Sequence, residues 1–158
     1  MKSPALNVVL HQPEIPANTG NIARTCLATG STLHLIKPLG FSIDDKQLKR
    51  AGLDYWHEVD VRLWESIEEL FAATAEARAR RFLFTTKCER PYSAAQYRAG
   101  DWLFFGRETK GLPESLLAEY AAQCVTIPMC NAARSLNLSV SVGVGVFEAC
   151  RQISEQAF

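Results

Sequence analysis

The stretch RSLNLSVSVGVGV, residues 134–146, fits two kinds of secondary structure, a strand and a helix. Which of the two it forms decides how the fold ends. From Leu136 to Val146 every second residue is Leu or Val, with polar or small residues between them, which is the period of a half-buried strand. Helical spacing fits equally well, because Leu136, Val140, Val144 and Phe147 would form one stripe along a helix. The alternation by itself does not separate the two structures.

The sequence around this stretch favours a helix. Gly143 and Gly145 would weaken a strand interior, and the segment FEACRQISEQ that follows has helical composition. In the helical interpretation a turn precedes the helix, and Ser135 or Asn137 lies at the start of the helix. In the other interpretation residues 131–134 form a turn, and the stretch is the last strand of a sheet that already has five or six.

Length and composition indicate one ordinary globular domain spanning residues 1–158. Hydrophobic residues make up 47% of the chain and charged residues 22%, and 17 basic residues balance 17 acidic ones. A zero net charge gives no global sign of a nucleic-acid partner, so any such binding needs a local patch. The five cysteines include no Cys-x-x-Cys, which disfavours a zinc site and a disulfide framework. With no signal peptide or membrane span apparent, we expect a cytoplasmic protein with no bound metal.

Strand-like and helix-like segments alternate along the chain. The short apolar runs 6–10, 33–36, 81–86, 102–106 and 124–128 are typical of buried strands. Helices should lie between them, and this alternation predicts an α/β fold with a mostly parallel sheet covered on both faces. Ligands of such sheets bind beyond the carboxyl ends of the strands, so chemistry is expected in the loops that follow them.

Helix boundaries are indicated by capping residues. We expect Asn18 to cap a helix that ends at Gly30, and residues 44–52 to form a short charged helix. Trp64, with the apolar residues after it, has helical spacing, and Ser66 with Glu69 could form a capping box. A further helix should begin at Pro113.

Three polar segments follow or adjoin these strands. NTGNIAR, residues 18–24, could be a plain helix start, or could direct at least two of Asn18, Asn21 and Arg24 toward one ligand. FFGRETKGLP, residues 104–113, could be a connecting loop, or its glycines could allow a ligand to approach the backbone closely. The third is the opening stretch. No Ser-His-Asp or Cys-His set can be assembled, and His11, His34 and His57 are interpreted as structural or surface groups.

Taken in order, NTGNIAR, GRETKGLP and IPM followed by RSLNLS resemble the three motifs of the SPOUT methyltransferases, which methylate RNA with S-adenosylmethionine. DDKQLKRAGLDYW and TTK are similar to the small branch that modifies the ribose of the tRNA wobble nucleotide. The resemblance implies transfer of a methyl group to the ribose 2′-hydroxyl of a cytidine or modified uridine in the anticodon loop, with leucine tRNAs expected. It also implies a C-terminal deep trefoil knot and a homodimer formed through the C-terminal helix.

The resemblance assigns roles to residues of this chain. The family's catalytic positions fall on Asn18, Arg24, Glu108, Ser135 and Asn137. The cofactor-binding positions are Phe84, Gly106, Gly111, Ile127, Ser135 and Leu136.

The hydroxyl proton must leave during transfer, and the family mechanism gives it to the arginine. Arg24 is a poor base because a guanidinium keeps its proton at neutral pH. Our hypothesis is that Arg24 holds an RNA phosphate while that phosphate or Glu108 relays the proton.

RNA binding must use local cations in a chain with no net charge. The expected contacts to a tRNA anticodon stem-loop are Lys46, Lys49, Arg50 and Lys87. Two other classes remain open: a non-catalytic RNA-binding or assembly protein, and a 2′-O-methyltransferase acting on another tRNA or rRNA position. A different nucleotide-using enzyme loses support because the chain has neither glycine-rich phosphate signature.

Overall fold

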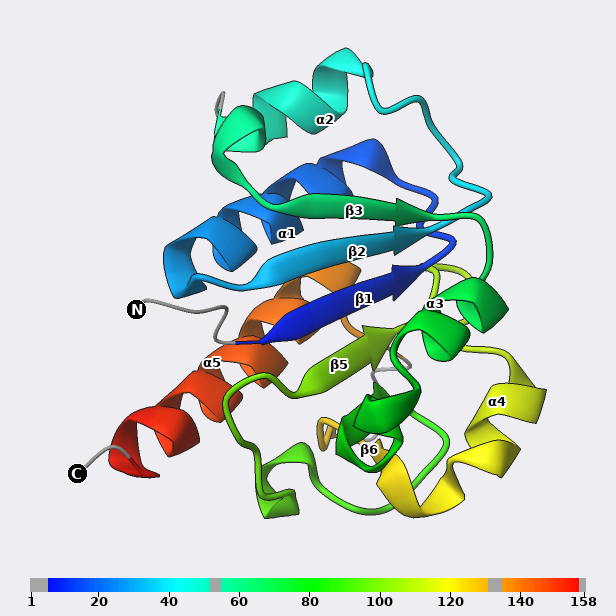
Figure 1. The fold of residues 1–158 in the computed structure, drawn as a ribbon, viewed down its shortest axis with the longest axis vertical. Coiled ribbons are helices and arrows are strands. Elements are labelled where there is room, and N and C mark those ends of the chain that lie inside the picture. Colours follow the sequence, from blue (N-terminus) through cyan, green and yellow to red (C-terminus); the bar gives the residue numbers. More distant parts are fainter. Residues whose placement is uncertain (1–5, 52–54, 131–134, 157–158) are drawn as a thin grey trace.

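The computed structural model describes residues 6–51, 55–130 and 135–156. Six strands form one sheet in the order β3-β2-β1-β5-β4-β6, and every pairing is parallel (Figure 1). The strands are β1 (Asn7–His11), β2 (Thr32–Ile36), β3 (Val61–Trp64), β4 (Arg81–Phe84), β5 (Trp102–Phe105) and β6 (Cys124–Val125). The predicted α/β class and parallel sheet are confirmed.

Helices cover both faces of the sheet, also as predicted. They are α1 (Pro16–Thr29), α2 (Lys46–Ala51), α3 (Ile67–Ala73), α4 (Glu114–Glu119) and α5 (Leu138–Gln156), with short 3₁₀ helices at Tyr55–Glu58, Ala75–Arg80, Tyr92–Ala94 and Ala121–Gln123. Because side chains alternate along a strand, Val8 packs with the apolar residues of α1 and α5, whereas Val9 packs with those of α3 and α4. The sheet therefore separates two apolar cores (Figure 1).

Residues 138–146 belong to helix α5, which confirms the helical interpretation. The side-chain oxygen of Asn137 accepts hydrogen bonds from the backbone N–H groups of Ser139 (2.9 Å) and Val140 (3.4 Å), as a helix-capping asparagine does. Gly145 lies against the sheet, and a β-carbon there would come within 2.7 Å of Cζ of Phe84. A glycine therefore fits best where α5 crosses the end of β4, since any larger residue would push the ring of Phe84 aside. The expected turn at 131–134, including Arg134, lies outside the described residues.

Two details of the predicted helices are wrong. Helix α1 begins at Pro16 and its N-cap is Ile15, which makes no side-chain capping bond, so Asn18 lies inside the first turn. Proline suits this first helical position because it lacks the N–H that would otherwise be unpaired. Trp64 is not in a helix but ends the edge strand β3, while the capping serine Ser66 accepts from the N–H of Glu69 (3.1 Å) as expected.

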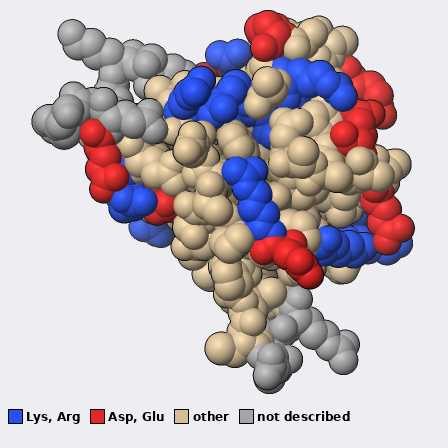
Figure 2. All heavy atoms as spheres, turned by 90° about the horizontal axis from the view of Figure 1, so that it is seen from below, with Lys and Arg blue, Asp and Glu red and all other residues tan. Residues whose placement is uncertain are grey.

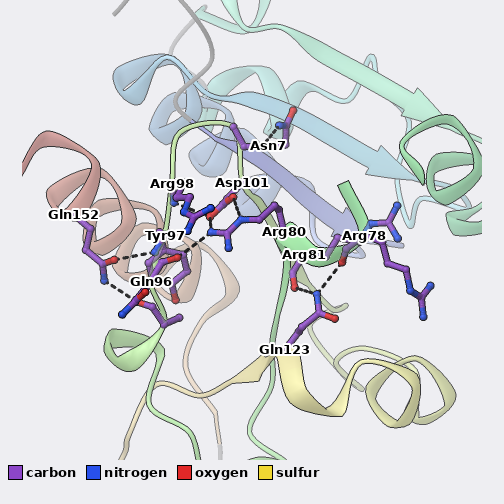
Figure 3. A network of polar contacts seen from close by, with 12 residues as sticks. Asn7, Arg78, Arg80, Arg81, Gln96, Tyr97, Arg98, Asp101, Gln123 and Gln152 are labelled. Atoms are coloured by element: carbon purple, nitrogen blue, oxygen red, sulfur yellow. Dashed lines mark hydrogen bonds and ion pairs between the residues drawn. The ribbon is translucent and has the colours of Figure 1, made fainter. Parts of the chain in front are cut away.

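The amino ends of β4 and β5 carry a polar network (Figure 3). Asp101, with its side chain 2% exposed, accepts from Nε of Arg80 (2.8 Å) and from the backbone N–H of Arg98 (2.7 Å). The side chain of Gln152 in α5 accepts from the backbone N–H of Tyr97 (2.9 Å). These contacts fasten the C-terminal half of α5 to the segment before β5, at the edge opposite the strand carboxyl ends.

The trefoil knot stays a prediction, since strand order and register alone do not define how the chain threads. Among the described residues, no helix is both long and apolar enough to cross a membrane. Within the same residues, no three His, Cys, Asp or Glu side chains form a group that could hold a metal ion.

Candidate active site

A cavity of about 1080 Å³ opens at the carboxyl ends of β1, β4, β5 and β6. This is the edge of a parallel sheet where ligands are expected. All the residues predicted to bind the cofactor line it, namely Phe84, Gly106, Gly111, Ile127, Ser135 and Leu136. The cavity is also lined by Asn18, Glu108 and Asn137. The three motifs therefore meet around one space.

The carboxylate of Glu108 binds the start of α1. One oxygen accepts from the backbone N–H of Glu14 (2.8 Å), and the other accepts from the N–H of Ile15 (2.8 Å) and from Nδ2 of Asn18 (3.2 Å). A negative charge at this position also interacts favourably with the helix dipole. Glu108, from a loop more than 90 residues away, thus fixes the two residues that precede α1, Glu14 and the N-cap residue Ile15.

Asn18 connects this contact to α5. Its Oδ1 accepts from Nδ2 of Asn137 (3.1 Å), while its own Nδ2 donates to Glu108. Both amides have a defined orientation, because the oxygen of Asn137 faces the N–H groups of α5 and that of Asn18 faces an amide donor. One residue from each motif therefore belongs to a continuous chain, Asn137 to Asn18 to Glu108. Asn18 is 6% exposed, so its polar atoms rely on these partners.

A second contact between the same loops was not predicted. Thr109 donates to Oε1 of Glu14 through its backbone N–H (3.0 Å) and through its hydroxyl (2.8 Å). These hydrogen bonds hold the pKa of Glu14 below its usual value. The two segments thus bind each other reciprocally, with Glu108 accepting from the backbone before α1 and Glu14 accepting from the backbone after Glu108. The sequence offers only the PEIP segment before the first motif as a signal for this contact.

The loop between Gly106 and Gly111 is a tight turn. A β-carbon on Gly106 would lie 1.9 Å from the carbonyl carbon of Gly111, and Gly111 has φ +69°, so both positions require glycine. The N–H of Gly111 donates to the carbonyl oxygen of Arg107 (2.9 Å). Beside this turn the ring of Phe84 stacks on that of Phe105, with centroids 4.5 Å apart. The cavity therefore has one wall of fixed backbone and one apolar wall.

Arg24 and most of the predicted RNA-binding cations lie elsewhere. Arg24 is exposed on α1 and does not line the cavity. Lys46, Lys49 and Arg50 belong to α2, which packs against α1, and they do not line the cavity either. Lys87 does line it, and its Nζ lies 3.0 Å from a carboxylate oxygen of Glu114. In Figure 2, Lys and Arg side chains lie among Asp and Glu side chains, so that neither charge covers the face shown.

His11 also lines the cavity, although the sequence suggested a structural or surface role. It ends β1, is 7% exposed, and its Nδ1 has no hydrogen-bond partner among the described residues. Burial, and then the positive charge of Arg107, lower the pKa of His11. The next residue, Gln12, has φ +55°, a value uncommon for a residue with a side chain.

Comparison with known proteins gives a consistent family. The model of the SpoU rRNA Methylase family matches residues 5–147. A tRNA (cytidine(34)-2′-O)-methyltransferase of Photorhabdus asymbiotica is 51% identical over 152 residues, 94% of each chain. The protein of the same name from Aeromonas hydrophila is 48% identical over 149 residues, again 94% of each chain.

Solved structures agree. One that concerns the 2′-OH methylation of C/U34 on tRNA has a TM-score of 0.90 and 49% identity, covering 95% of this chain and 97% of the other. An rRNA methyltransferase of Sinorhizobium meliloti with bound S-adenosylmethionine has a TM-score of 0.82 and 25% identity, covering 95% of this chain and 57% of the other. The match of the family model over most of the sequence, together with relatives near 50% identity, shows that this chain belongs to the SpoU rRNA methylase family.

Proposed function

We propose that this protein, as a single domain of residues 1–158, transfers a methyl group from S-adenosylmethionine to the ribose 2′-hydroxyl of the wobble nucleotide of tRNA. The relatives named for cytidine 34 support the position, and the expectation of leucine tRNAs comes from the resemblance alone. The observation that carries the proposal is the hydrogen-bonded chain from Asn137 through Asn18 to Glu108, which joins all three motifs beside the cavity.

The cavity fits S-adenosylmethionine in size and in chemistry. Its volume of about 1080 Å³ is at the upper end of the range for small-molecule sites, which leaves room for part of a second reactant. Apolar side chains from Phe84, Ile127 and Leu136 can cover the adenosine, and the backbone of the Gly106–Gly111 turn offers polar groups at close approach. When bound, the cofactor supplies an electrophilic methyl group on a sulfonium centre.

The main catalytic contribution that we assign to the protein is to position the two reactants. An in-line displacement gains most of its rate from correct distance and orientation. The hydrogen bonds that join Asn137, Asn18 and Glu108 fix the loop of the second motif, the start of α1 and the start of α5 relative to one another. Ser135, at the edge of the cavity, is assigned to orienting the cofactor or the ribose.

The contacts favour a structural role for Glu108 over the proton relay that we considered. Both its oxygens accept hydrogen bonds from the start of α1, and the three bonds fill most of the acceptor sites of the carboxylate. Arg24 keeps its proposed role of holding an RNA phosphate, for which a permanently charged planar guanidinium is suited. Of the two relays considered, the substrate phosphate is then the better supported.

A homodimer through α5 is the second part of the proposal. The outward side of this helix exposes Val140 (49%) and Phe147 (55%) at helical spacing, and Leu136 (38%) is exposed just before the helix begins. Gly143 lies between them, and a β-carbon there would meet no atom within 4 Å, which leaves room for a second helix. An exposed apolar stripe of this kind is typical of an interface. A dimer would also double the number of cations available to one anticodon stem-loop.

The test is incubation with labelled S-adenosylmethionine and total tRNA, followed by mapping of the methylated nucleotide. We expect a 2′-O-methyl group at position 34, with unlabelled rRNA as the negative control. Label in rRNA, or at another tRNA position, would contradict the substrate assignment. S-Adenosylmethionine failing to bind in calorimetry would favour a non-catalytic RNA-binding protein. A cytoplasmic location stays a prediction that follows from the proposed substrate.

A further inference from the structure

One part of the cavity is not used by the hydrogen-bonded chain described above. It lies between the carboxyl end of β1 and the turn after β5, two strands that are neighbours in the sheet (Figure 1). His11 and Arg107 both line it. Neither residue was assigned a role in binding the cofactor.

His11 is a buried polar group without a partner. Along β1 it has the same orientation as Val9, toward the face of α3 and α4, away from Asn18 and Asn137. Its side chain is more than nine-tenths buried, and its Nδ1 bonds to none of the described residues. Because buried polar atoms are nearly always paired, a histidine that lines a cavity while its buried Nδ1 is unpaired is a candidate for a ring that contacts a ligand there.

Arg107 is a half-buried cation that is not neutralised by contact. Its guanidinium forms no ion pair or hydrogen bond with any residue in the described ranges. Of the acids around the subsite, Glu108 binds the start of α1 and Glu14 binds Thr109, whereas Glu68 of α3 acts on His11 from a distance and raises its pKa, against the effect of Arg107. The backbone of Arg107 is held by the bond to Gly111, so its side chain starts from a fixed point. Burial, and then the charge of Arg107, lower the pKa of His11. An anion between the two residues would neutralise Arg107 and accept a hydrogen bond from His11.

We propose that His11 and Arg107 form a subsite for a backbone phosphate of the RNA substrate. The guanidinium fork binds two phosphate oxygens, and a ring N–H of His11 donates to the phosphate or to the adjoining sugar. This inference rests on the proposed function.

Position in the sheet favours the RNA over the carboxylate of S-adenosylmethionine as the source of the anion. The apolar residues assigned to the cofactor follow β4 and β6 or precede α5. Between β1 and β6 lie three strand spacings, about 14 Å in all. The Gly106–Gly111 turn, which follows β5, reaches the cofactor through its backbone, so the side chains at the β1 end of the cavity are available to the methyl acceptor.

The subsite is tested with Arg107→Met and His11→Phe, which remove the charge and the ring nitrogens while keeping most of the side-chain volume. Arg62→Met is the matched control, because Arg62 is exposed on the edge strand β3 and lies outside the cavity. The dissociation constants for tRNA and for S-adenosylmethionine are measured separately, with thermal unfolding to check that each variant is folded.

For Arg107→Met we expect the Kd for tRNA to rise about tenfold and the slope of log Kd against log salt to fall by about 0.7, as for one lost phosphate contact on a single-stranded loop. His11→Phe should weaken tRNA binding about fivefold, and neither variant should change the affinity for S-adenosylmethionine. Arg107→Met behaving like Arg62→Met would overturn the inference, as would weakened cofactor binding with unchanged tRNA binding. A wild-type protein that binds no tRNA would instead contradict the proposed function.

Discussion

Replacing Glu108 by Gln tests the contact that joins the site to the fold. The carboxylate accepts three hydrogen bonds, two of them at 2.8 Å from backbone N–H groups. Gln keeps one acceptor oxygen, so one backbone N–H of Glu14 or Ile15 would face an NH₂ donor. A hydrogen bond to a charged group contributes about 1.5–3 kcal/mol, and the negative charge at the helix start adds up to about 1 kcal/mol. We expect the free energy of unfolding to fall by about 2–3 kcal/mol.

Denaturant titration followed by circular dichroism measures this loss, and thermal unfolding should show Tm lowered by about 4–10 °C for a chain of this length. Glu65→Gln is the matched control, because Glu65 forms an ion pair with Lys37 at 3.0 Å in which its side chain is 76% exposed. Removing such a surface pair should cost less than about 1 kcal/mol.

Two results would refute the reasoning. If Glu108→Gln unfolds with the same free energy as Glu65→Gln, the carboxylate does not anchor α1. If Glu108→Gln keeps wild-type stability and cofactor affinity but loses methyl transfer, Glu108 acts on the proton, as in the relay that the contacts disfavour. A parallel loss of stability and rate supports the positioning role.

Three further predictions concern packing, pH and assembly. Gly145→Ala should destabilise the protein by about 1–3 kcal/mol, because the new β-carbon would overlap the ring of Phe84; the loss, measured by denaturant titration, should shrink in a Phe84→Leu background. His34 is buried as the neutral form, with its pKa lowered from 6.5 to about 4 by burial, whereas the unfolded chain takes up the proton below pH 6.5. Stability should therefore fall by about 3 kcal/mol as pH drops from 6.5 to 4, and His34→Gln should flatten that slope in unfolding experiments. Phe147→Glu should give a monomer in light scattering, and an unchanged dimer mass would exclude α5 as the interface.

The neutral form of His34 follows from its neighbours. Its Nδ1 accepts from Nε1 of Trp64 (3.0 Å), which fixes a proton on Nε2, and that nitrogen lies 3.0 Å from Oδ1 of Asn7. The same hydrogen bond explains why Trp64 was wrongly predicted to lie in a helix. Its spacing to the apolar residues of α3 is helical, but its indole N–H donates to a buried histidine on the neighbouring strand, which keeps Trp64 in β3. The edge strand β3 is also hard to recognise in the sequence, because an edge strand needs no continuous apolar run and its Leu63 is exposed.

The candidate site was predictable as a set of residue types but not as a set of contacts. Some site residues are set by local structure, which a sequence pattern can indicate. Gly106 and Gly111 are required by a tight turn, and Asn137 caps a helix. The roles of Asn18 and Glu108 depend on a contact between loops 90 residues apart. Capping rules assigned Asn18 to its own helix, whereas the acceptor for the start of α1 comes from the other loop. No local rule contains that information.

The alternation in residues 136–146 has a physical origin of its own. Residues two positions apart on a helix are separated by about 200°, so Gly143 and Gly145 lie on nearly opposite sides of α5. Gly145 is small because Phe84 leaves no room for a side chain, and Gly143 lies on the outward side, where nothing in the same subunit approaches it. A helix in close contact on two sides needs small residues on both, and the resulting spacing imitates a strand. A second copy of α5 packed against Gly143 would supply the contact on the outer side, so the same sequence pattern that obscures the helix also supports the dimer.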